Sequence, residues 1–265
     1  MGEAREMLSL TQEWVREAGT KIRAFLAVGT VRFETKSRKN DLVTEMDRET
    51  ERFLVEKIMT HFPEHRIMGE EGITERPERF DGYVWFIDPI DGTSNFVTQG
   101  CDFVISIALY HGREGILAIV YDVMRDEMIY TVRGEGVYLN GHQCPSLAAD
   151  DRALIDSLVA VEFIFRSETS DEYMSKIMEL GPHIRGFRVF GATALAMAKV
   201  AVGRVQAFVT AGTNPWDFAA GKMLIEAAGG RVSDLRGECL VLEERCPVLA
   251  SVPSIYGELR DWIAK

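Results

Sequence analysis

The stretch that decides the fold runs Tyr83-Val-Trp-Phe-Ile-Asp-Pro-Ile-Asp-Gly-Thr-Ser-Asn-Phe96. Its first five residues are continuously apolar, which is typical of a strand buried on both faces of a sheet. This strand leads directly into Asp88, and Pro89 then withholds a backbone N–H and is expected to turn the chain. Asp91 follows three residues later, so we expect two carboxylates at the end of one central strand. Such a pair predicts a site for divalent cations.

The residues that follow this pair, Gly92-Thr93-Ser94, predict the start of a helix. The first N–H groups of a helix have no partner within it and bind anions well. Carboxylates for cations, placed beside amides for an anion, are what phosphate chemistry requires. The alternative is a simple turn in which Asp88 caps the next helix. That alternative accounts for one aspartate but not for a buried strand that delivers two.

Other acidic residues stand at comparable positions. Glu70 and Glu71 follow a short predicted strand at residues 66–68. Adjacent side chains of an extended chain point to opposite sides, so we expect Glu70 to face the site and Glu71 to lie in an exposed loop. Asp47 and Asp217 each lie near the expected start of a helix. A capping role explains Asp47 equally well, so the pattern alone leaves its role open, and a carboxylate at the position of Asp217 is more often an N-cap than a ligand.

Periodicity outlines the first half of the chain. Apolar residues at helical spacing predict an amphipathic helix from about Arg5 to Ala27. A second helix is expected to begin with a capping box at Thr44 and to end at Pro63. From Phe103 to Tyr138, short β-rich runs alternate with turn residues, which predicts an antiparallel meander. Asn140-Gly141 is a strong signal for a hairpin turn.

The second half alternates strand, helix and strand. The expected strands span 158–165, 185–190 and 205–209, and the expected helices span 171–180, 192–202 and 216–228. We therefore expect an N-terminal α+β lobe at residues 1–145, with most of the candidate metal ligands. A C-terminal α/β lobe at residues 146–265 would supply Asp217.

Composition limits the classes of function. The chain has 265 residues, 46% apolar and 27% charged, as in an average folded protein. No apolar run approaches the roughly 18 residues that a membrane-spanning helix needs, so we expect no membrane association. With 30 basic and 41 acidic residues the net charge is −11, which disfavours nucleic-acid binding through a basic surface. The four cysteines form no Cys-x-x-Cys pair and the start lacks a signal-peptide core. We therefore expect a cytoplasmic protein with reduced thiols.

Four motifs together resemble those of a known family. They are Asp-Leu-Val-Thr-x-x-Asp at 41–47, Gly-Glu-Glu at 69–71, Asp-Pro-Ile-Asp-Gly-Thr at 88–93 and Trp-Asp at 216–217. In this order they resemble the inositol monophosphatase family of lithium-sensitive, magnesium-dependent phosphatases, and most of all its Bacillus-type bacterial members. The resemblance covers nearly the whole chain. It implies an α+β or α/β fold, a five-layered αβαβα sandwich of the inositol monophosphatase and fructose-1,6-bisphosphatase type. It also implies a homodimer and a small phosphorylated metabolite as substrate.

The resemblance also assigns roles to single residues. Two Mg²⁺ ions would be held by oxygen ligands at five positions: Glu70, Asp88, Ile90 (through its carbonyl), Asp91 and Asp217. A third, looser Mg²⁺ could be positioned by Glu70 through water. The implied catalytic residues are Glu70, Asp47 and Thr93, of which Asp47 and Thr93 would orient and deprotonate the attacking water. The implied substrate contacts are Asp91, Gly92, Thr93, Arg188, Thr193 and Asp217.

The chain departs from the animal members of this family where the leaving group binds. Those enzymes place a glutamate seven residues before the Trp-Asp aspartate, and this chain has Thr210 there. A hydroxyl is a weaker and shorter partner than a carboxylate. We therefore expect relaxed specificity, and a gain in selectivity for inositol phosphate from Thr210→Glu. Arg188 matches an arginine that the family keeps near the substrate, although a surface or dimer-interface role fits it equally well.

These observations predict a magnesium-dependent phosphomonoesterase. It would hydrolyse inositol monophosphate to inositol and phosphate by two-metal activation of water. The nearest alternative is a fructose-1,6-bisphosphatase, or an NADP or nucleotide phosphatase, of the same fold. An alternative from another class is a metal-dependent regulatory binding protein with vestigial catalysis. The presence of Thr93 and of all five candidate carboxylates argues against this last alternative; the carboxylates are Asp47, Glu70, Asp88, Asp91 and Asp217.

Overall fold

The N-terminal part of the molecule is a helical layer beside a small hairpin. The computed structural model describes residues 2–28, 33–35, 42–163 and 168–264, so Asp41 of the first motif lies outside the described residues. The helices are α1 (Gly2–Val28) and α2 (Glu45–His61), and β1 (Phe33–Thr35) pairs antiparallel with β2 (Leu42–Thr44). The predicted capping box is present at α2. The Thr44 N–H donates to the Asp47 carboxylate over 2.9 Å, and the Asp47 N–H donates back to the Thr44 hydroxyl over 3.4 Å.

The predicted meander forms most of a seven-stranded sheet. In spatial order its strands are β3 (Arg66–Gly69), β4 (Tyr83–Asp91), β5 (Val104–His111), β6 (Glu114–Asp122), β7 (Glu127–Val132), β8 (Tyr138–Leu139) and β9 (His142–Gln143). Only the β3–β4 pair is parallel. Asn140 and Gly141 connect β8 to β9 with φ values of 48° and 85°. Two positive φ angles are what a type I′ hairpin turn requires, so this prediction is confirmed.

The end of β4 differs from the prediction. We expected Pro89 to turn the chain out of the sheet, but the strand continues to Asp91. Asp88 pairs with Ser106 and Asp91 with Val104, so β4 uses one residue more than β5 between these two pairs. Side chains three residues apart on a regular strand face opposite sides. The extra residue of this bulge returns both aspartates to the same side of the strand. Because the ladder is interrupted between Asp88 and Asp91, no hydrogen bond is needed from Pro89, which has no N–H.

The C-terminal half forms a second sheet of five strands. Their spatial order is β11 (Gly186–Arg188), β10 (Leu158–Glu162), β12 (Ala207–Thr213), β14 (Cys246–Ser251) and β13 (Arg231–Ser233). Strands β11, β10 and β12 are parallel, and β14 runs antiparallel to its two neighbours. The helices of this half are α4 (Glu168–Glu179), α5 (Thr193–Ala201), α6 (Pro215–Ala227) and α7 (Pro253–Ile263). The strand expected over 158–165 ends at Glu162, and positions 164 and 165 lie outside the described residues.

Short helices complete the chain. α3 (Thr93–Gln99) begins directly after the bulged end of β4, as the Gly92-Thr93-Ser94 pattern predicted. Three single 3₁₀ turns occur at Leu147–Ala149, Leu154–Asp156 and Gly181–His183. No helix in the described parts of the chain is both long and apolar enough to cross a membrane.

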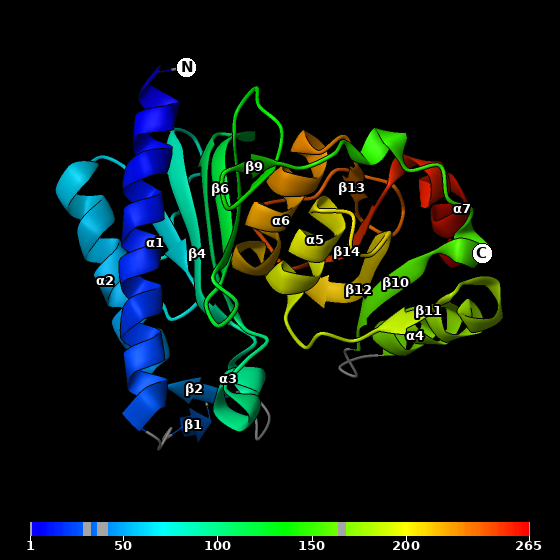
Figure 1. Cartoon of the computed structure of the whole chain (residues 1–265), viewed down its shortest axis with the longest axis horizontal. Helices are drawn as coiled ribbons and strands as arrows, with labels where there is room; N and C mark the ends of the chain where they lie inside the picture. Colours follow the sequence, from blue (N-terminus) through cyan, green and yellow to red (C-terminus); the bar gives the residue numbers. More distant parts are fainter. Residues whose placement is uncertain (1, 29–32, 36–41, 164–167, 265) are drawn as a thin grey trace.

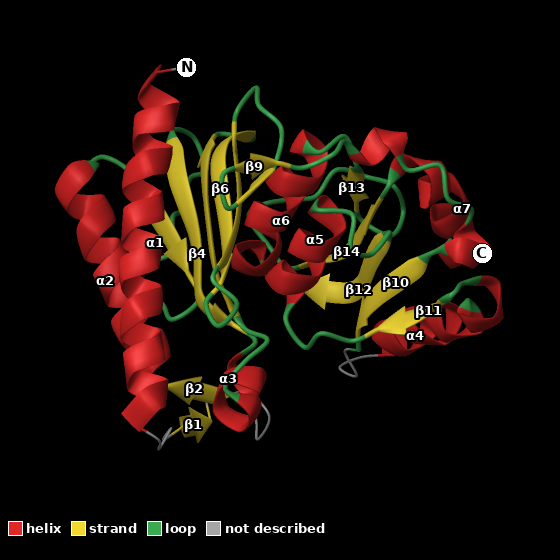
Figure 2. Cartoon of the chain, viewed as in Figure 1, coloured by secondary structure: helices red, strands yellow, loops and turns green. Residues whose placement is uncertain are grey.

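The elements stack in five layers (Figures 1 and 2). α1 and α2 cover one face of the seven-stranded sheet, α5 and α6 lie between the two sheets, and α4 and α7 cover the far face of the five-stranded sheet. The predicted αβαβα sandwich is therefore confirmed. Trp85 belongs to the core under α1 and α2, whereas its neighbour Phe86 belongs to the core between the sheets. β4 is thus buried on both faces, as its continuous apolar run predicted. The lobe boundary at residues 145 and 146 stays a prediction.

Candidate active site

A polar cavity of about 280 Å³ lies between the two sheets, at the end of β4. Helices α3, α5 and α6 all begin around it, so both halves of the chain contribute to its wall. Its lining consists mainly of acidic and hydroxyl-bearing residues: Glu70, Asp88, Ile90, Asp91, Gly92, Thr93, Glu162, Thr193, Asn214, Trp216 and Asp217. Every position that the sequence assigned to metal binding is in this set.

Asp88 and Asp91 are presented to the cavity by the bulge of β4. Only 2% of Asp88 and 7% of Asp91 is exposed. The Ile90 N–H donates to Asp88 Oδ1 over 3.1 Å, which orients that carboxylate. The two oxygens of Asp91 accept the backbone N–H groups of Thr193, at 3.1 Å, and of Leu195, at 3.2 Å. These N–H groups belong to the first turn of α5, so Asp91 also fastens the N-terminal sheet to a helix of the other half.

Asp217 and Asp47 are both helix caps and neighbours of the site. Asp217 Oδ2 accepts the Asn214 N–H over 2.8 Å and the Thr213 hydroxyl over 2.5 Å, and it completes a capping box at the start of α6. Asp47 is fully buried, and its Oδ1 accepts the Thr93 hydroxyl over 3.2 Å. Asp217 therefore caps a helix and lines the cavity, and Asp47 caps a helix and contacts the cavity residue Thr93. Their roles in the chemistry stay predictions.

The electrostatics of the cavity favour bound cations. Burial raises the pKa of Asp88 well above its usual value, and the negative charges of Glu70 and its other acidic neighbours raise it further. Burial and the charge of Asp217 do the same to the pKa of Asp91. Burial also raises the pKa of Asp217 to about 6, although its hydrogen bonds with Thr213 and Asn214 act in the opposite direction. Without positive charge, these carboxylates gain protons instead of ionising together.

The candidate ligand atoms in the cavity are of the kind that a hard divalent cation binds. The candidate ligands that line the cavity are carboxylate and carbonyl oxygens, which Mg²⁺ prefers. The positions are those implied for metal binding: Glu70, Asp88, Ile90, Asp91 and Asp217. Within the described ranges, no three His, Cys, Asp or Glu side chains already stand in the arrangement of a metal site. The structure therefore brings the ligands to one cavity and leaves the coordination geometry itself a prediction.

Glu70 faces the cavity because a buried glutamate holds the loop that carries it. Glu51 Oε2 accepts the Glu71 N–H over 2.8 Å, and Glu51 Oε1 accepts the Ile73 N–H over 3.0 Å. Gly69 lies against this carboxylate so closely that a Cβ there would collide with it. Sequence reasoning missed Glu51. Its signal was the i, i+4 spacing from Asp47, which places both side chains on one face of α2.

Glu162 is the second acidic residue that sequence reasoning missed. It is the last residue of β10, it lines the cavity, and its Oε2 accepts the hydroxyl of Thr193. The predicted strand extended beyond Glu162, so the end of β10 was not recognised from the sequence. Thr213, Asn214 and Trp216 were not predicted either. Trp216 lines the cavity, yet its indole N–H is buried without a hydrogen-bond partner.

The two positions singled out for specificity lie outside the cavity lining. Arg188 is exposed at the end of β11, and its guanidinium donates to the Phe187 carbonyl over 2.7 Å. Thr210 is fully buried in β12, where its hydroxyl accepts the Gly212 N–H over 3.4 Å. Among the described residues, neither is brought to the wall of the cavity.

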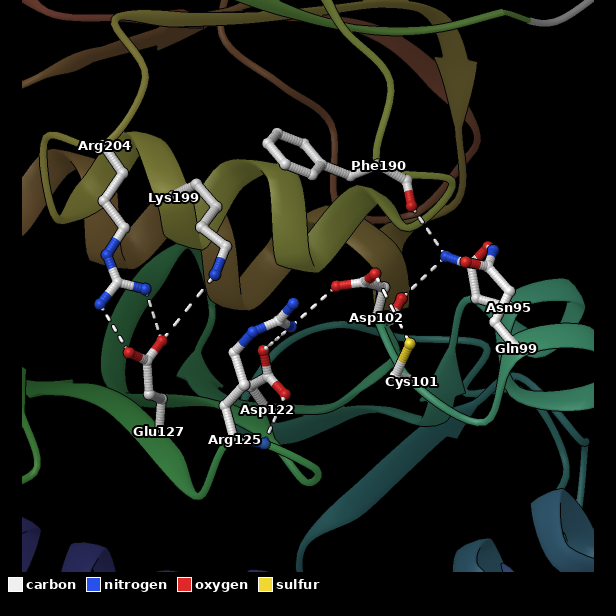
Figure 3. Close-up of polar contacts among 10 residues, drawn as sticks. All are labelled: Asn95, Gln99, Cys101, Asp102, Asp122, Arg125, Glu127, Phe190, Lys199 and Arg204. Atoms are coloured by element: carbon white, nitrogen blue, oxygen red, sulfur yellow. Dashed lines mark hydrogen bonds and ion pairs between the residues drawn. The ribbon is translucent and has the colours of Figure 1, made fainter.

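Polar contacts fasten the two halves together beside the cavity (Figure 3). The Asn95 amide of α3 donates to the Phe190 carbonyl over 2.7 Å and to the Asp102 carbonyl over 2.8 Å. Further along the same interface, the Arg204 guanidinium forms an ion pair with Glu127 of β7 at 2.5 Å. The Asn95 contacts hold the start of α3 against the segment that leads into α5. They thereby fix the width of the cavity between Thr93 and Thr193.

Comparisons with known proteins agree with this geometry. The model of the inositol monophosphatase family matches residues 3–265. The chain is 38% identical to the inositol-1-monophosphatase of Bacillus subtilis (strain 168) over 251 residues, 95% of this chain and 94% of that protein. It is 35% identical to the Nus factor SuhB of Escherichia coli (strain K12) over 233 residues, 87% of this chain and 86% of that protein.

A solved structure extends the similarity to the whole fold. The crystal structure of inositol monophosphatase II from Staphylococcus aureus MSSA476 superposes with a TM-score of 0.84 at 30% identity, covering 97% of this chain and 92% of that chain. The resemblance predicted from the four motifs is thus confirmed by sequence and by fold. The chain belongs to the inositol monophosphatase family and is a phosphoric monoester hydrolase.

Proposed function

We propose that this protein hydrolyses inositol monophosphate to inositol and phosphate with two Mg²⁺ ions, and that it accepts other small phosphate monoesters. The observation that carries the proposal is the convergence of Glu70, Asp88, Asp91 and Asp217 on the same cavity as Thr93. The 38% identity to an inositol-1-monophosphatase over nearly the full length supports the choice of substrate.

The carboxylates and the Ile90 carbonyl would hold the ions. Mg²⁺ held there would supply the polarisation that activates a water and the positive charge that offsets the phosphate. A third ion, positioned by Glu70 through water, is part of the same proposal. The raised pKa values of Asp88 and Asp91 mean that Mg²⁺ binding displaces protons from the cavity, so affinity should rise with pH.

Asp47 and Thr93 would position and deprotonate the attacking water. The Thr93 hydroxyl donates to Asp47 Oδ1 over 3.2 Å, so its oxygen lone pairs remain able to accept a proton from that water. The proton then passes towards the Asp47 carboxylate. Asp47 is also fixed by the Thr44 N–H, so the pair is held rigidly at the junction of α2 and α3.

The backbone at Gly92 and Thr93 would grip the phosphate. Gly92 has a φ of 94°, and a Cβ there would approach Ala192 to 3.0 Å and the Asp102 carbonyl to 3.2 Å. A glycine therefore lets the start of α3 come close to the start of α5. The N–H groups at the start of α3 are the donors that an anion would find next to the carboxylates, because those of Thr193 and Leu195 in α5 already donate to Asp91.

A second candidate function is regulatory. The 35% identity to a protein named Nus factor SuhB favours a role in which this chain binds a macromolecular partner. A fructose-1,6-bisphosphatase or an NADP phosphatase remains the alternative within the same chemistry. A cytoplasmic homodimer and inhibition by lithium stay predictions.

Phosphate release from purified protein tests these alternatives. The panel would contain inositol 1-phosphate, fructose 1,6-bisphosphate, NADP and adenosine 3′,5′-bisphosphate, each with Mg²⁺ and after exhaustive chelation. We expect the highest kcat/KM for inositol 1-phosphate and no activity after chelation. A protein that releases no phosphate from any member of the panel with Mg²⁺ would favour the regulatory candidate. Full activity without metal would refute the proposed use of Mg²⁺.

A further inference from the structure

We propose that Arg125 is a positioning residue that acts through Asp102 on the segment carrying Gly92 and Thr93. Its guanidinium holds Asp102 in a left-handed backbone conformation, and the Asp102 carbonyl in turn supports that segment. The inference rests on the proposed function, in which Gly92 and Thr93 contact the phosphate and the attacking water. It adds a residue that lies outside the cavity lining.

Arg125 lies in the turn between β6 and β7 (Figure 3). Its Nη1 lies 2.8 Å from Asp122 Oδ2 and 2.7 Å from Asp102 Oδ1, and its backbone N–H donates to Asp122 Oδ1 over 3.1 Å. Only 3% of the Asp122 side chain is exposed, against 33% of the side chain of Asp102. One guanidinium therefore joins a buried carboxylate at the end of β6 to a partly exposed one in the loop between α3 and β5.

The turn that carries Arg125 is itself held from two sides. The guanidinium of Arg23, in α1, donates to the Val123 carbonyl over 2.9 Å. Glu127, at the start of β7, forms the ion pair with Arg204 described above. The turn is thus fastened both to the outer helical layer and to the C-terminal half, and it can serve as a support for the loop beside it.

Asp102 needs such a support because of its backbone. Its φ is 57°, in the left-handed region that residues with a side chain adopt at a cost. In this conformation its carboxylate reaches Arg125 while its carbonyl accepts a hydrogen bond from α3, so the ion pair stabilises the left-handed backbone. A glycine at the same position would adopt this φ without help.

The Asp102 carbonyl touches the site segment at two points. It accepts the Asn95 amide of α3 over 2.8 Å, and it would lie 3.2 Å from a Cβ at Gly92. Gly92 directly precedes Thr93, whose hydroxyl donates to Asp47. A rotation of the Asp102 peptide would therefore remove one partner of Asn95 and leave the backbone at Gly92 without its neighbour.

Steady-state kinetics of Arg125→Gln, with Mg²⁺, test the inference. The Arg125 side chain is 46% exposed, so its pair with Asp102 should have the value of a surface ion pair. We therefore expect kcat/KM for inositol 1-phosphate to fall about fivefold, or about 1 kcal/mol. The matched control is Arg133→Gln, which should stay within about twofold of the wild type. Arg133 is 49% exposed and pairs with Glu114 at 2.9 Å.

Two further readouts locate the effect. The inhibition constant of inorganic phosphate should rise by the same factor as kcat/KM falls, because both depend on the fraction of molecules in which Gly92 and Thr93 are in place. The Mg²⁺ concentration for half-maximal activity should not change, because Arg125 contacts none of the candidate metal ligands.

Rescue variants separate positioning from stability. In the Arg125→Gln background, Asp102→Gly should restore kcat/KM to within about twofold of Asp102→Gly alone, because glycine keeps the left-handed φ without an ion pair. Asp122→Asn in the same background should raise the melting temperature, because it removes a buried carboxylate that has lost its ion-pair partner. It should not restore activity, since it leaves the Asp102 backbone unsupported.

The outcomes are distinguishable from failure of the proposed function. The inference is wrong, and the phosphatase proposal stands, if Arg125→Gln matches Arg133→Gln, if Asp102→Gly fails to restore activity, or if Asp122→Asn restores it. If the wild type hydrolyses no phosphate monoester, the proposed function fails and the inference fails with it. Should Arg125→Gln not fold, Asp102→Ala and Asp102→Gly decide the matter. Both remove the carboxylate, but only alanine resists the left-handed φ, so equal activity of the two would overturn the inference.

Discussion

The two halves of the molecule deliver carboxylates to the cavity in different ways. The first half uses one bulged strand end, where Asp88 and Asp91 stand within four residues. The second half uses Glu162 and Asp217, which lie far apart in the sequence. Glu162 accepts the hydroxyl of Thr193, and Asp217 accepts that of Thr213. In the first half, both carboxylates come from one short segment at the end of β4. In the second half, they come from separate segments that the fold brings together. We therefore expect changes at the end of β4 to abolish catalysis, and changes at β10 and β12 to alter selectivity or stability.

The largest effect is expected from Asp88→Asn. Asp88 would contact both ions, so kcat should fall by about 10³-fold or more, roughly 4 kcal/mol of barrier. The metal-free variant should melt at the wild-type temperature or above, because a buried charge that its neighbours repel has been removed. Steady-state kinetics and thermal melting with and without Mg²⁺ check both statements. Asp261→Asn, at an exposed position of α7, is the control, and near-wild-type turnover in Asp88→Asn would refute the assignment.

The part of the site at the end of β4 could be predicted because Asp88 and Asp91 are close neighbours in the chain. The apolar run predicts a buried strand, the two aspartates stand at its end, and Gly92-Thr93 predicts the start of the next helix. The bulge could not be predicted, since it depends on how Ser106 and Val104 of β5 pair with β4. Glu162 was missed because its importance arises only from the register that places β10 beside β12 and from the approach of Thr193. Strands β13 and β14 were not predicted, because short strands joined by long-range antiparallel pairing leave little periodicity to detect. Helix α7 was overlooked although its buried residues Ile255, Leu259 and Ile263 recur at helical spacing.

The second prediction concerns Thr210→Glu. A sequence-only view expects this change to sharpen selectivity, but Thr210 is fully buried and lies beside Glu162 in the sheet. A second carboxylate there would be desolvated and would face a like charge, so we expect a loss of several kcal/mol in the free energy of unfolding. Thr210→Val should cost less than about 1 kcal/mol, because the bond it removes, to the Gly212 N–H at 3.4 Å, is long. Chemical denaturation measures both, and equal stability of the two variants would contradict the buried placement.

The metal-free protein should lose stability as the pH rises through the range of the cavity carboxylates. Burial raises the pKa of Asp217 from 3.8 to about 6, so between these values the folded protein binds more protons than the unfolded chain. Stability then falls with increasing pH, and the raised pKa values of Asp88 and Asp91 act in the same direction. Melting curves from pH 4 to pH 8 in a chelator measure the slope. Asp217→Asn should flatten it, and saturating Mg²⁺ should reverse it.

Glu51→Gln is expected to act at a distance from the chemistry. Both oxygens of Glu51 accept N–H groups of the loop that carries Glu70, and a glutamine offers only one acceptor oxygen. Its NH₂ group would face a backbone N–H, so the loop should loosen and kcat should fall about 10- to 100-fold, as is usual when a residue that orients a metal ligand is lost. The concentration of Mg²⁺ needed for half-maximal activity should rise in parallel. Unchanged Mg²⁺ dependence with a lower kcat would show that Glu51 serves only the stability of the loop.

The smallest effect is expected from Arg188→Ala. This variant tests whether the substrate contacts the C-terminal half beyond the cavity, at the end of β11. Arg188 is exposed, its guanidinium donates to the Phe187 carbonyl, and it does not line the described cavity. Surface substitutions of this kind change free energies by about 0.5 kcal/mol or less, so kcat/KM for inositol 1-phosphate should stay within about twofold of the wild type. Glu162→Gln in the same assay supplies the contrast, because it removes a carboxylate from the cavity wall itself. A loss of more than tenfold in Arg188→Ala would mean that substrate recognition extends beyond the cavity to the end of β11.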